Sequence, residues 1–166
     1  MKTGFFKQID DSCHATIVSV SLYPSNNELV KFEYKALVPN WKLLDSLNKQ
    51  NISEDIFISS YREQLNLLDS EKVYNDLNSL GDKDDIILMT DGSKKKFCYR
   101  HLIAEWLQKE LDVEIEEYRV GKVSRNNGYM KKIENPTLFW LEKLSFFVFC
   151  FFFHVKKIVL QPMNLN

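Results

Sequence analysis

A cysteine, an arginine and a histidine stand within four positions of one another, at Cys98, Arg100 and His101. They follow an apolar run, Asp85 to Met89, that is typical of a buried strand, and they open a stretch with apolar residues at helical spacing, Arg100 to Leu111. The expected order is strand, loop, helix. Free N–H groups and the dipole at a helix start favour an anion and make a thiol there more easily ionised. The pattern therefore predicts a site at this loop.

If the site is catalytic, Cys98 is the predicted nucleophile, Arg100 the anion clamp and His101 the acid/base or orienting partner. Each residue also has a structural interpretation. Cysteine is often buried as a small hydrophobic residue. Arg100 could form an ion pair with Glu105 or Asp91, and His101 is four residues from Glu105, at hydrogen-bonding distance along one helix face. The sequence alone leaves open whether the protein is an enzyme.

The ligand expected at this loop is an anionic small molecule or a nucleotide-like molecule. The residues predicted to bind it are Asp91, Lys94, Lys95, Lys96 and Glu105. A lysine run is also typical of a solvated loop. A broad nucleic-acid surface is not favoured, because residues 1–118 hold 14 Lys and Arg against 21 Asp and Glu. No cofactor is predicted, since no Walker-type or Gly-x-Gly-x-x-Gly stretch occurs.

Two other chemistries fit the sequence less well. A thiol phosphatase or sulfurtransferase loop would need an arginine six residues after the cysteine, and position 104 is alanine. A zinc site could be assembled only from Cys13, His14, Cys98 and His101, which lack paired Cys-x-x-Cys spacing. We therefore predict no metal.

Strand and helix patterns alternate along the chain. β-branched residues at Ala15 to Leu22 predict the first strand, and Val113 to Tyr118 alternates as a last strand should. Helices are predicted between them, at residues 41–47, 56–68 and 73–80, with caps near Ser53 and Asp69. This alternation predicts an α/β, Rossmann-like layered domain with a mostly parallel sheet flanked by helices. Ligands of such sheets bind beyond the carboxyl ends of the strands, where the Cys98 loop would lie.

Residues 1–118 resemble the DUF488 family, small bacterial and phage α/β domains of unassigned function. The resemblance is carried by Phe97-Cys98-Tyr99-Arg100-His101-Leu102-Ile103-Ala104-Glu105-Trp106-Leu107, with Glu33 to Pro39 and Asp69 to Val73 in the family's order. It implies that Cys98, Arg100 and His101 are the site positions. Tyr99, Gly4 and Thr90-Asp91-Gly92 stand where the family has a histidine, a serine and Cys-Tyr-Glu. An alternative function stays open: a non-catalytic accessory protein of phage or mobile-element origin that acts through a protein or nucleic-acid partner.

The remaining predictions concern location and the end of the chain. Three widely spaced cysteines and a start without a secretory signal favour the cytoplasm. Residues 119–166 form a basic, Phe-rich extension, with 8 Lys and Arg against 2 Asp and Glu, separate from domain 1–118. Its uncharged stretch from Leu144 to Phe153 is about half the ~20 residues of a membrane-spanning helix. Interfacial membrane contact and an added extension both stay open, and no oligomeric state is indicated.

Overall fold

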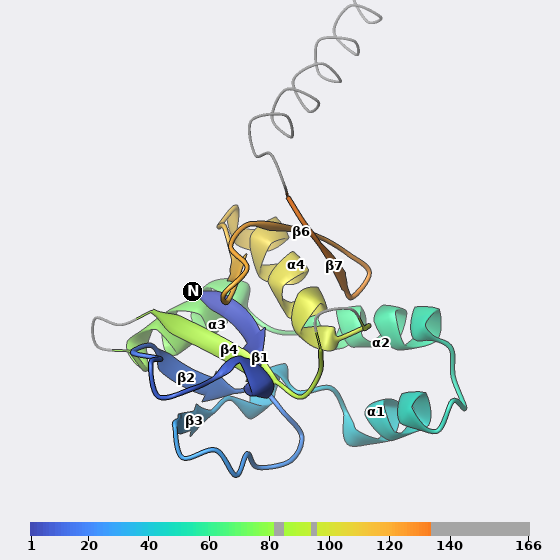
Figure 1. Ribbon diagram of the computed structural model, residues 1–166. Coiled ribbons are helices and arrows are strands. Elements are labelled where there is room, and N and C mark those ends of the chain that lie inside the picture. Colours follow the sequence, from blue (N-terminus) through green and yellow to red (C-terminus); the bar gives the residue numbers. More distant parts are fainter. Residues whose placement is uncertain (82–84, 94–95, 134–166) are drawn as a thin grey trace, which may run out of the picture. The chain divides into compact units, whose positions relative to one another are not determined.

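Five parallel strands form one sheet in the computed structural model, which describes residues 1–81, 85–93 and 96–133 (Figure 1). The strands are β1 (Lys2–Phe5), β2 (Thr16–Ser19), β3 (Val30–Glu33), β4 (Ile86–Thr90) and β5 (Glu116–Glu117). Their order in the sheet is β3-β2-β4-β1-β5, so β4 is central, between β2 and β1. The predicted α/β class with a parallel sheet is confirmed.

In the part of the chain that the structure describes, four α-helices accompany the sheet: α1 (Trp41–Asn48), α2 (Glu54–Asn66), α3 (Ser70–Ser79) and α4 (Tyr99–Leu111). The side chains of Asn40, Ser53 and Asp69 accept hydrogen bonds from backbone N–H groups in the first turns of α1, α2 and α3. The caps predicted near Ser53 and Asp69 are therefore confirmed. Two short 3-10 helices, η1 (Phe6–Gln8) and η2 (Lys35–Leu37), lie between the early elements.

The core has two parts because successive residues of a strand point to opposite faces of the sheet. Leu88 of β4 packs in the larger cluster, which includes Phe57 of α2 and Leu102 of α4. Its neighbours Ile87 and Met89 belong to a smaller cluster on the other face, contacted by η1 and the loop before β2. All five residues of β4 are buried, as its apolar run predicts.

Several elements differ from the prediction. The segment at residues 15–22 contains a strand, as predicted, but it is the second strand, β2, because Lys2–Phe5 forms β1. β3 is an additional, largely exposed edge strand. The last strand of the sheet contains only Glu116–Glu117. After it, β6 (Val123–Asn126) and β7 (Tyr129–Lys132) form an antiparallel hairpin that the prediction missed.

The described compact unit runs from Met1 to Lys132 and so includes this hairpin. Residues 134–166, where the predicted Phe-rich extension continues, lie outside the described residues, and the division of the chain at Tyr118 stays a prediction. In the described ranges, no helix combines the length and the apolar character needed to cross a bilayer.

Candidate thiol site

Cys98 is the residue immediately before α4, and its thiol lies over the carboxyl end of β4. The Sγ atom is 3.3 Å from Thr90 Oγ1, and it donates a 3.6 Å hydrogen bond to the carbonyl of Asp91. The loop is also bonded to the segment that follows the neighbouring strand β2, because the Asp91 N–H donates to Ser21 Oγ over 3.1 Å. Cys98 is 4% exposed. The predicted strand-loop-helix unit is thus present, with the thiol at the helix start.

The hairpin β6–β7 holds the other side of this loop. The Cys98 N–H donates to the carbonyl of Gly128 over 2.9 Å, and the Phe97 ring packs against the hairpin turn. Phe97 also meets Tyr129 with ring centroids 5.9 Å apart. Asn127 and Gly128 both have positive φ, 51° and 80°, as a two-residue hairpin turn requires. The hairpin therefore positions the backbone of Cys98.

Replacing Gly128 by alanine should destabilise the protein, because the new Cβ would lie 2.3 Å from Phe97 Cε2 and φ is +80°. Gly121 is a matched control, since its φ is +85° and no atom lies within 4 Å of the corresponding Cβ. We expect Gly128→Ala to lower the free energy of unfolding by about 1–3 kcal/mol more than Gly121→Ala does. Urea denaturation measures both variants. Equal losses would show that the Phe97 contact does not constrain the turn.

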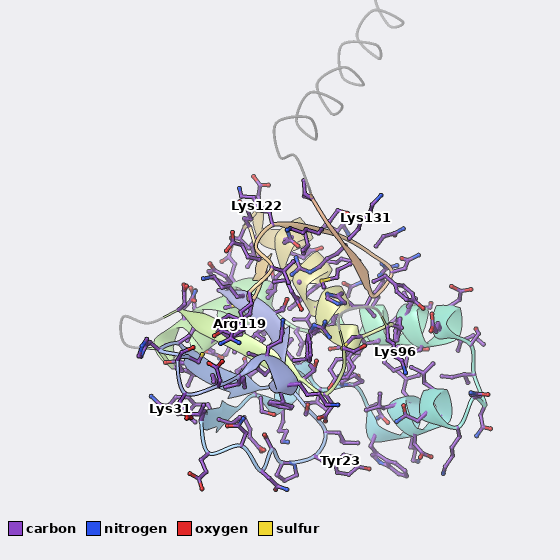
Figure 2. All side chains as sticks on the ribbon, in the orientation of Figure 1. Tyr23, Lys31, Lys96, Arg119, Lys122 and Lys131 are labelled. Carbon is purple, nitrogen blue, oxygen red and sulfur yellow. The ribbon has the colours of Figure 1, made fainter. Side chains whose placement is uncertain are left out.

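Two neighbouring hollows open beside the thiol loop. The smaller, about 210 Å³, is lined by Cys98, Asp91, Tyr99 and Tyr23, together with Leu22, Leu44, Leu47, Asn48 and Phe97. The larger, about 610 Å³, is lined by Lys96 and Tyr129 and by Leu47, Asn48, Gln50, Ile52, Glu54 and Phe97. The two share Leu47, Asn48 and Phe97, so they are adjacent. Figure 2 shows Tyr23 and Lys96 among the side chains around α1 and the start of α4.

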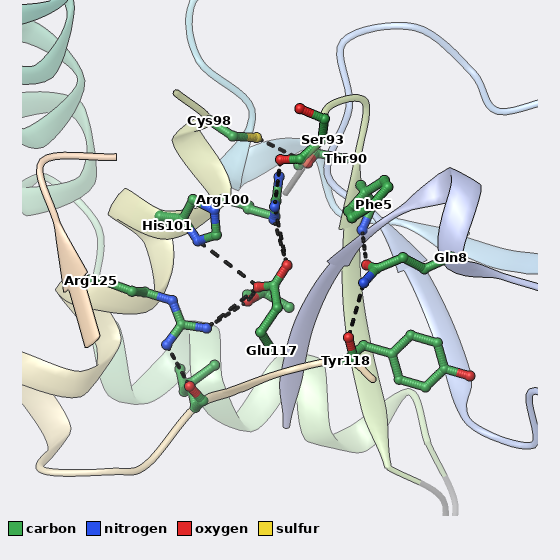
Figure 3. A network of polar contacts seen from close by, with 12 residues as sticks. Phe5, Gln8, Thr90, Ser93, Cys98, Arg100, His101, Glu117, Tyr118 and Arg125 are labelled. Atoms are coloured by element: carbon green, nitrogen blue, oxygen red, sulfur yellow. Dashed lines mark hydrogen bonds and ion pairs between the residues drawn. The ribbon is translucent and has the colours of Figure 1, made fainter. Parts of the chain in front are cut away.

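A buried charge cluster lies behind the loop (Figure 3). The carboxylate of Glu117 accepts a 3.1 Å hydrogen bond from Arg100 Nε and a 2.7 Å hydrogen bond from Thr3 Oγ1. Arg125 Nη2 lies 3.6 Å from the same carboxylate and donates to Thr3 Oγ1 over 2.9 Å. His101 Nδ1 is 3.9 Å from Glu117 Oε2. The side chains of Arg100, His101 and Glu117 have no exposed surface.

The cluster carries more positive than negative charge. Burial lowers the pKa of His101 to about 2, so its imidazole is neutral at pH 7 and its approach to Glu117 is no ion pair. Burial also lowers the pKa of Arg125 to about 10, which leaves its guanidinium charged. Arginine stays protonated in proteins, so two guanidiniums face the single carboxylate of Glu117.

One guanidinium nitrogen of Arg100 approaches the thiol loop without a partner. Arg100 Nη2 donates to the carbonyl of Ser93 over 3.2 Å, whereas Nη1 has no hydrogen-bond partner within the part of the chain that the structure describes. A Cβ placed on Gly92 would lie 3.1 Å from Nη1 and 3.3 Å from Cys98 Sγ. Because Gly92 has no side chain, the Arg100 guanidinium and the Cys98 thiol can both lie close to the position that a Cβ would occupy. The backbone φ of +153° at this residue also suits glycine.

The structure brings some of the predicted site residues together. Cys98 and Asp91 line the smaller hollow, and Lys96 lines the larger one. Arg100 is in an ion pair, but its partner is Glu117 and not Glu105 or Asp91. Lys94 and Lys95 lie outside the described residues.

The predicted hydrogen bond between His101 and Glu105 is wrong. Both ring nitrogens of His101 lack a hydrogen-bond partner among the described residues. Glu105 Oε2 instead accepts from Arg62 Nη2 of α2 over 3.0 Å, and neither His101 nor Glu105 lines the hollow beside Cys98. The cause is tertiary packing. His101 lies on the side of α4 that faces Glu117 of β5, and Glu105 pairs with Arg62 of α2.

The alternative zinc set does not assemble either. Cys13 and His14 precede β2 and line a separate hollow of about 480 Å³ with Lys2, Asp85 and Tyr118, at the amino ends of the strands. Cys98 follows β4 and lies at the carboxyl ends of the strands, which is the opposite end of the sheet from Cys13 and His14. In the described ranges, no group of three or more His, Cys, Asp or Glu side chains could hold a metal ion.

The sequence reasoning missed Thr3, Glu117 and Arg125. The burial of Glu117 could have been predicted, because it is two residues after the apolar Ile115, and alternation in a strand places both side chains on the same face. The position of Arg125 in a hairpin could have been predicted indirectly, because Asn127-Gly128 between short β patterns is typical of a hairpin turn. Thr3 lies in a strand of only four residues, which carries little pattern.

Comparison with known proteins gives a match to a family model. The family model DUF488-N3a, described as the active DUF488-N3 subclade, matches residues 19–111, more than half of the chain. The match includes β4, the thiol loop and α4, and it stops before β5 and the hairpin. No curated protein and no solved structure matches.

Proposed function

The chain belongs to the DUF488 family, and from this premise we propose that its thiol loop binds an anionic, nucleotide-like small molecule and presents Cys98 to it. The observation that carries the proposal is Arg100 Nη1, a buried guanidinium nitrogen beside the thiol that has no partner among the described residues. A buried donor that lacks a partner is costly, so its position beside Gly92 and the thiol of Cys98, which lines the smaller hollow, favours a ligand or reaction role.

Three positive features act on the same loop. The first turn of α4 carries free N–H groups and the positive end of its dipole. The cluster behind the loop has two guanidiniums against one carboxylate. Lys96 lines the larger hollow in front of it. Together they attract a phosphate or carboxylate group to the hollows beside the loop.

In the catalytic form of this proposal, the sulfur of Cys98 forms a bond to an electrophilic centre of the bound molecule, the bond between that centre and its leaving group breaks, and the thiol proton passes to the leaving group. The charge of Arg100 stabilises the negative charge that develops in this step. The description of the matching subclade as active supports a chemical role for the loop. His101 belongs to the buried cluster in this proposal, and it stays neutral there.

A second function is favoured by the burial of Cys98, which is 4% exposed. In this alternative the protein is a non-catalytic accessory factor, of phage or mobile-element origin, and the loop serves as a structural turn. The two functions differ in a measurable way. The alternative requires no small-molecule binding and an unreactive thiol.

Calorimetric titration of the full chain with ribose 5-phosphate and with nucleoside monophosphates tests the proposal. We expect binding, and we expect Lys96→Gln to weaken it roughly fivefold, equivalent to the ~1 kcal/mol of one charge pair near 4 Å in water. Lys31→Gln is the matched control, since Lys31 is exposed on the edge strand β3 (Figure 2). Absence of binding by every compound would contradict the proposal and favour the accessory-factor alternative.

A further inference from the structure

We infer that the hollow beside Cys98 holds an amino-bearing nucleobase, adenine- or cytosine-like, and that the phosphate of the same nucleotide lies toward Lys96. This inference rests on the proposed function and assigns the ligand class of that site. It arises from the different chemistry of the two adjacent hollows.

The smaller hollow is unsuited to a phosphate. Among the residues that the structure describes, its lining has one charged residue, Asp91, which is acidic, and no lysine or arginine. The rest is mainly aromatic and aliphatic, including Tyr23, Phe97 and Tyr99. Its volume of about 210 Å³ is below the ~300–1,000 Å³ of pockets that hold a complete small ligand. It therefore accommodates a flat, uncharged part of a larger molecule.

The polar residues of this hollow select the kind of ring. A carboxylate accepts hydrogen bonds, so Asp91 favours an exocyclic amino group over a carbonyl oxygen. Asn48 lines both hollows and offers an amide, which can donate to a ring nitrogen and accept from an amine. Tyr23, whose ring is 71% exposed, adds an aromatic face at the opening of the hollow. Bases stack on such faces.

Among the described residues, the larger hollow is lined by one cationic side chain, Lys96, and one acidic side chain, Glu54, whose carboxylate accepts a 2.7 Å hydrogen bond from Tyr129. Lys96 is therefore the side chain there that can attract a phosphate. A nucleotide with its base against Asp91 passes Phe97, which lines both hollows, and reaches Lys96, which lines the larger hollow and not the smaller one. The residue order Lys96-Phe97-Cys98 then places the thiol beside the base and sugar and the ammonium beside the phosphate. The complementary charges of Asp91 and Lys96 thus fix the direction in which the ligand lies.

Binding of matched nucleotide pairs to the full chain tests this inference. AMP and IMP differ by an amino group against a carbonyl oxygen, as do CMP and UMP. We expect the amino nucleotide of each pair to bind about tenfold or more tightly, the lower end of discrimination by a well-placed hydrogen-bonded pair. Asp91→Asn should reduce this ratio to below about threefold, because an amide both donates and accepts. Asp11→Asn is the control, since Asp11 is exposed and lines neither hollow.

The outcomes separate this inference from the proposed function. Discrimination that Asp91→Asn removes and Asp11→Asn preserves would support it. Equal binding of amino and carbonyl nucleotides, or ribose 5-phosphate binding as tightly as AMP, would overturn the base assignment and leave the anion-binding proposal intact. Failure of every compound to bind would overturn both.

Discussion

Replacing Glu117 by glutamine is expected to lower the free energy of unfolding by about 3–5 kcal/mol, the usual loss when one partner of a buried ion pair is removed. The carboxylate of Glu117 is fully buried, pairs with Arg100 and lies 3.6 Å from Arg125. Without it, two buried guanidiniums face each other with no counter-charge. Such a loss is a large part of the ~5–15 kcal/mol that stabilises a typical domain. Urea denaturation with a common slope measures it.

Glu116→Gln is the matched control for this experiment. Glu116 is the neighbouring residue of β5, partly exposed, and its side chain points to the other face of the strand. We expect its free energy of unfolding to change by less than about 0.5 kcal/mol. If both variants lost the same small amount of unfolding free energy, the Glu117 carboxylate would not balance the charges of Arg100 and Arg125. The proposed electrostatic effect of the cluster on the thiol loop would then be wrong.

The second large effect concerns acid stability and comes from His101. Its pKa is lowered by burial from 6.5 to about 2, with Arg100 and Arg125 adding to the effect. Below pH 6.5 the unfolded chain binds a proton at this histidine and the folded chain does not. Its contribution to stability is therefore complete above pH 6.5 and is lost as the pH falls toward 2. Between pH 7 and pH 4 the expected loss is about 3 kcal/mol.

Comparing the unmodified chain with His101→Leu isolates this contribution from that of the carboxylates. The variant should show a free energy of unfolding that falls less steeply with decreasing pH, so that the difference between the two proteins changes by about 3 kcal/mol from pH 7 to pH 4. The exposed His14 provides the control, and His14→Asn should preserve the slope. Parallel pH profiles for the unmodified chain and His101→Leu would show that His101 is protonated in the folded protein.

Local patterns were sufficient for the elements that bury one clear face. The helices α2, α3 and α4 and the strand β4 were predicted within a few residues, because their apolar spacing and capping residues lie in one continuous segment. The short β1 and the polar edge strand β3 were missed. Four residues, one of them Gly4, carry little periodicity, and Gly4 is required there because a Cβ would lie 2.8 Å from Met89 Sδ.

The site was predicted only in part, for a related reason. Cys98 and Arg100 stand two positions apart in the sequence, so a local pattern placed them at the helix start. The partner of Arg100 is 17 positions away at Glu117, and Arg125 arrives through the hairpin. Tertiary contacts between segments that are distant in sequence determine these pairings. Helical spacing had instead indicated Glu105 as the hydrogen-bond partner of His101, which was wrong.

Alkylation of Cys98 in the full chain, with and without AMP, is the most direct test of the central claim that the thiol loop is a ligand site. Mass spectrometry of one digest also reports Cys13, at the opposite edge of the sheet, as an internal control. We expect Cys98 to react in the free protein and AMP at ten times its Kd to slow this reaction about tenfold, while the labelling of Cys13 stays unchanged. A Cys98 that stays unlabelled while Cys13 reacts, or one whose labelling AMP does not slow, would contradict it.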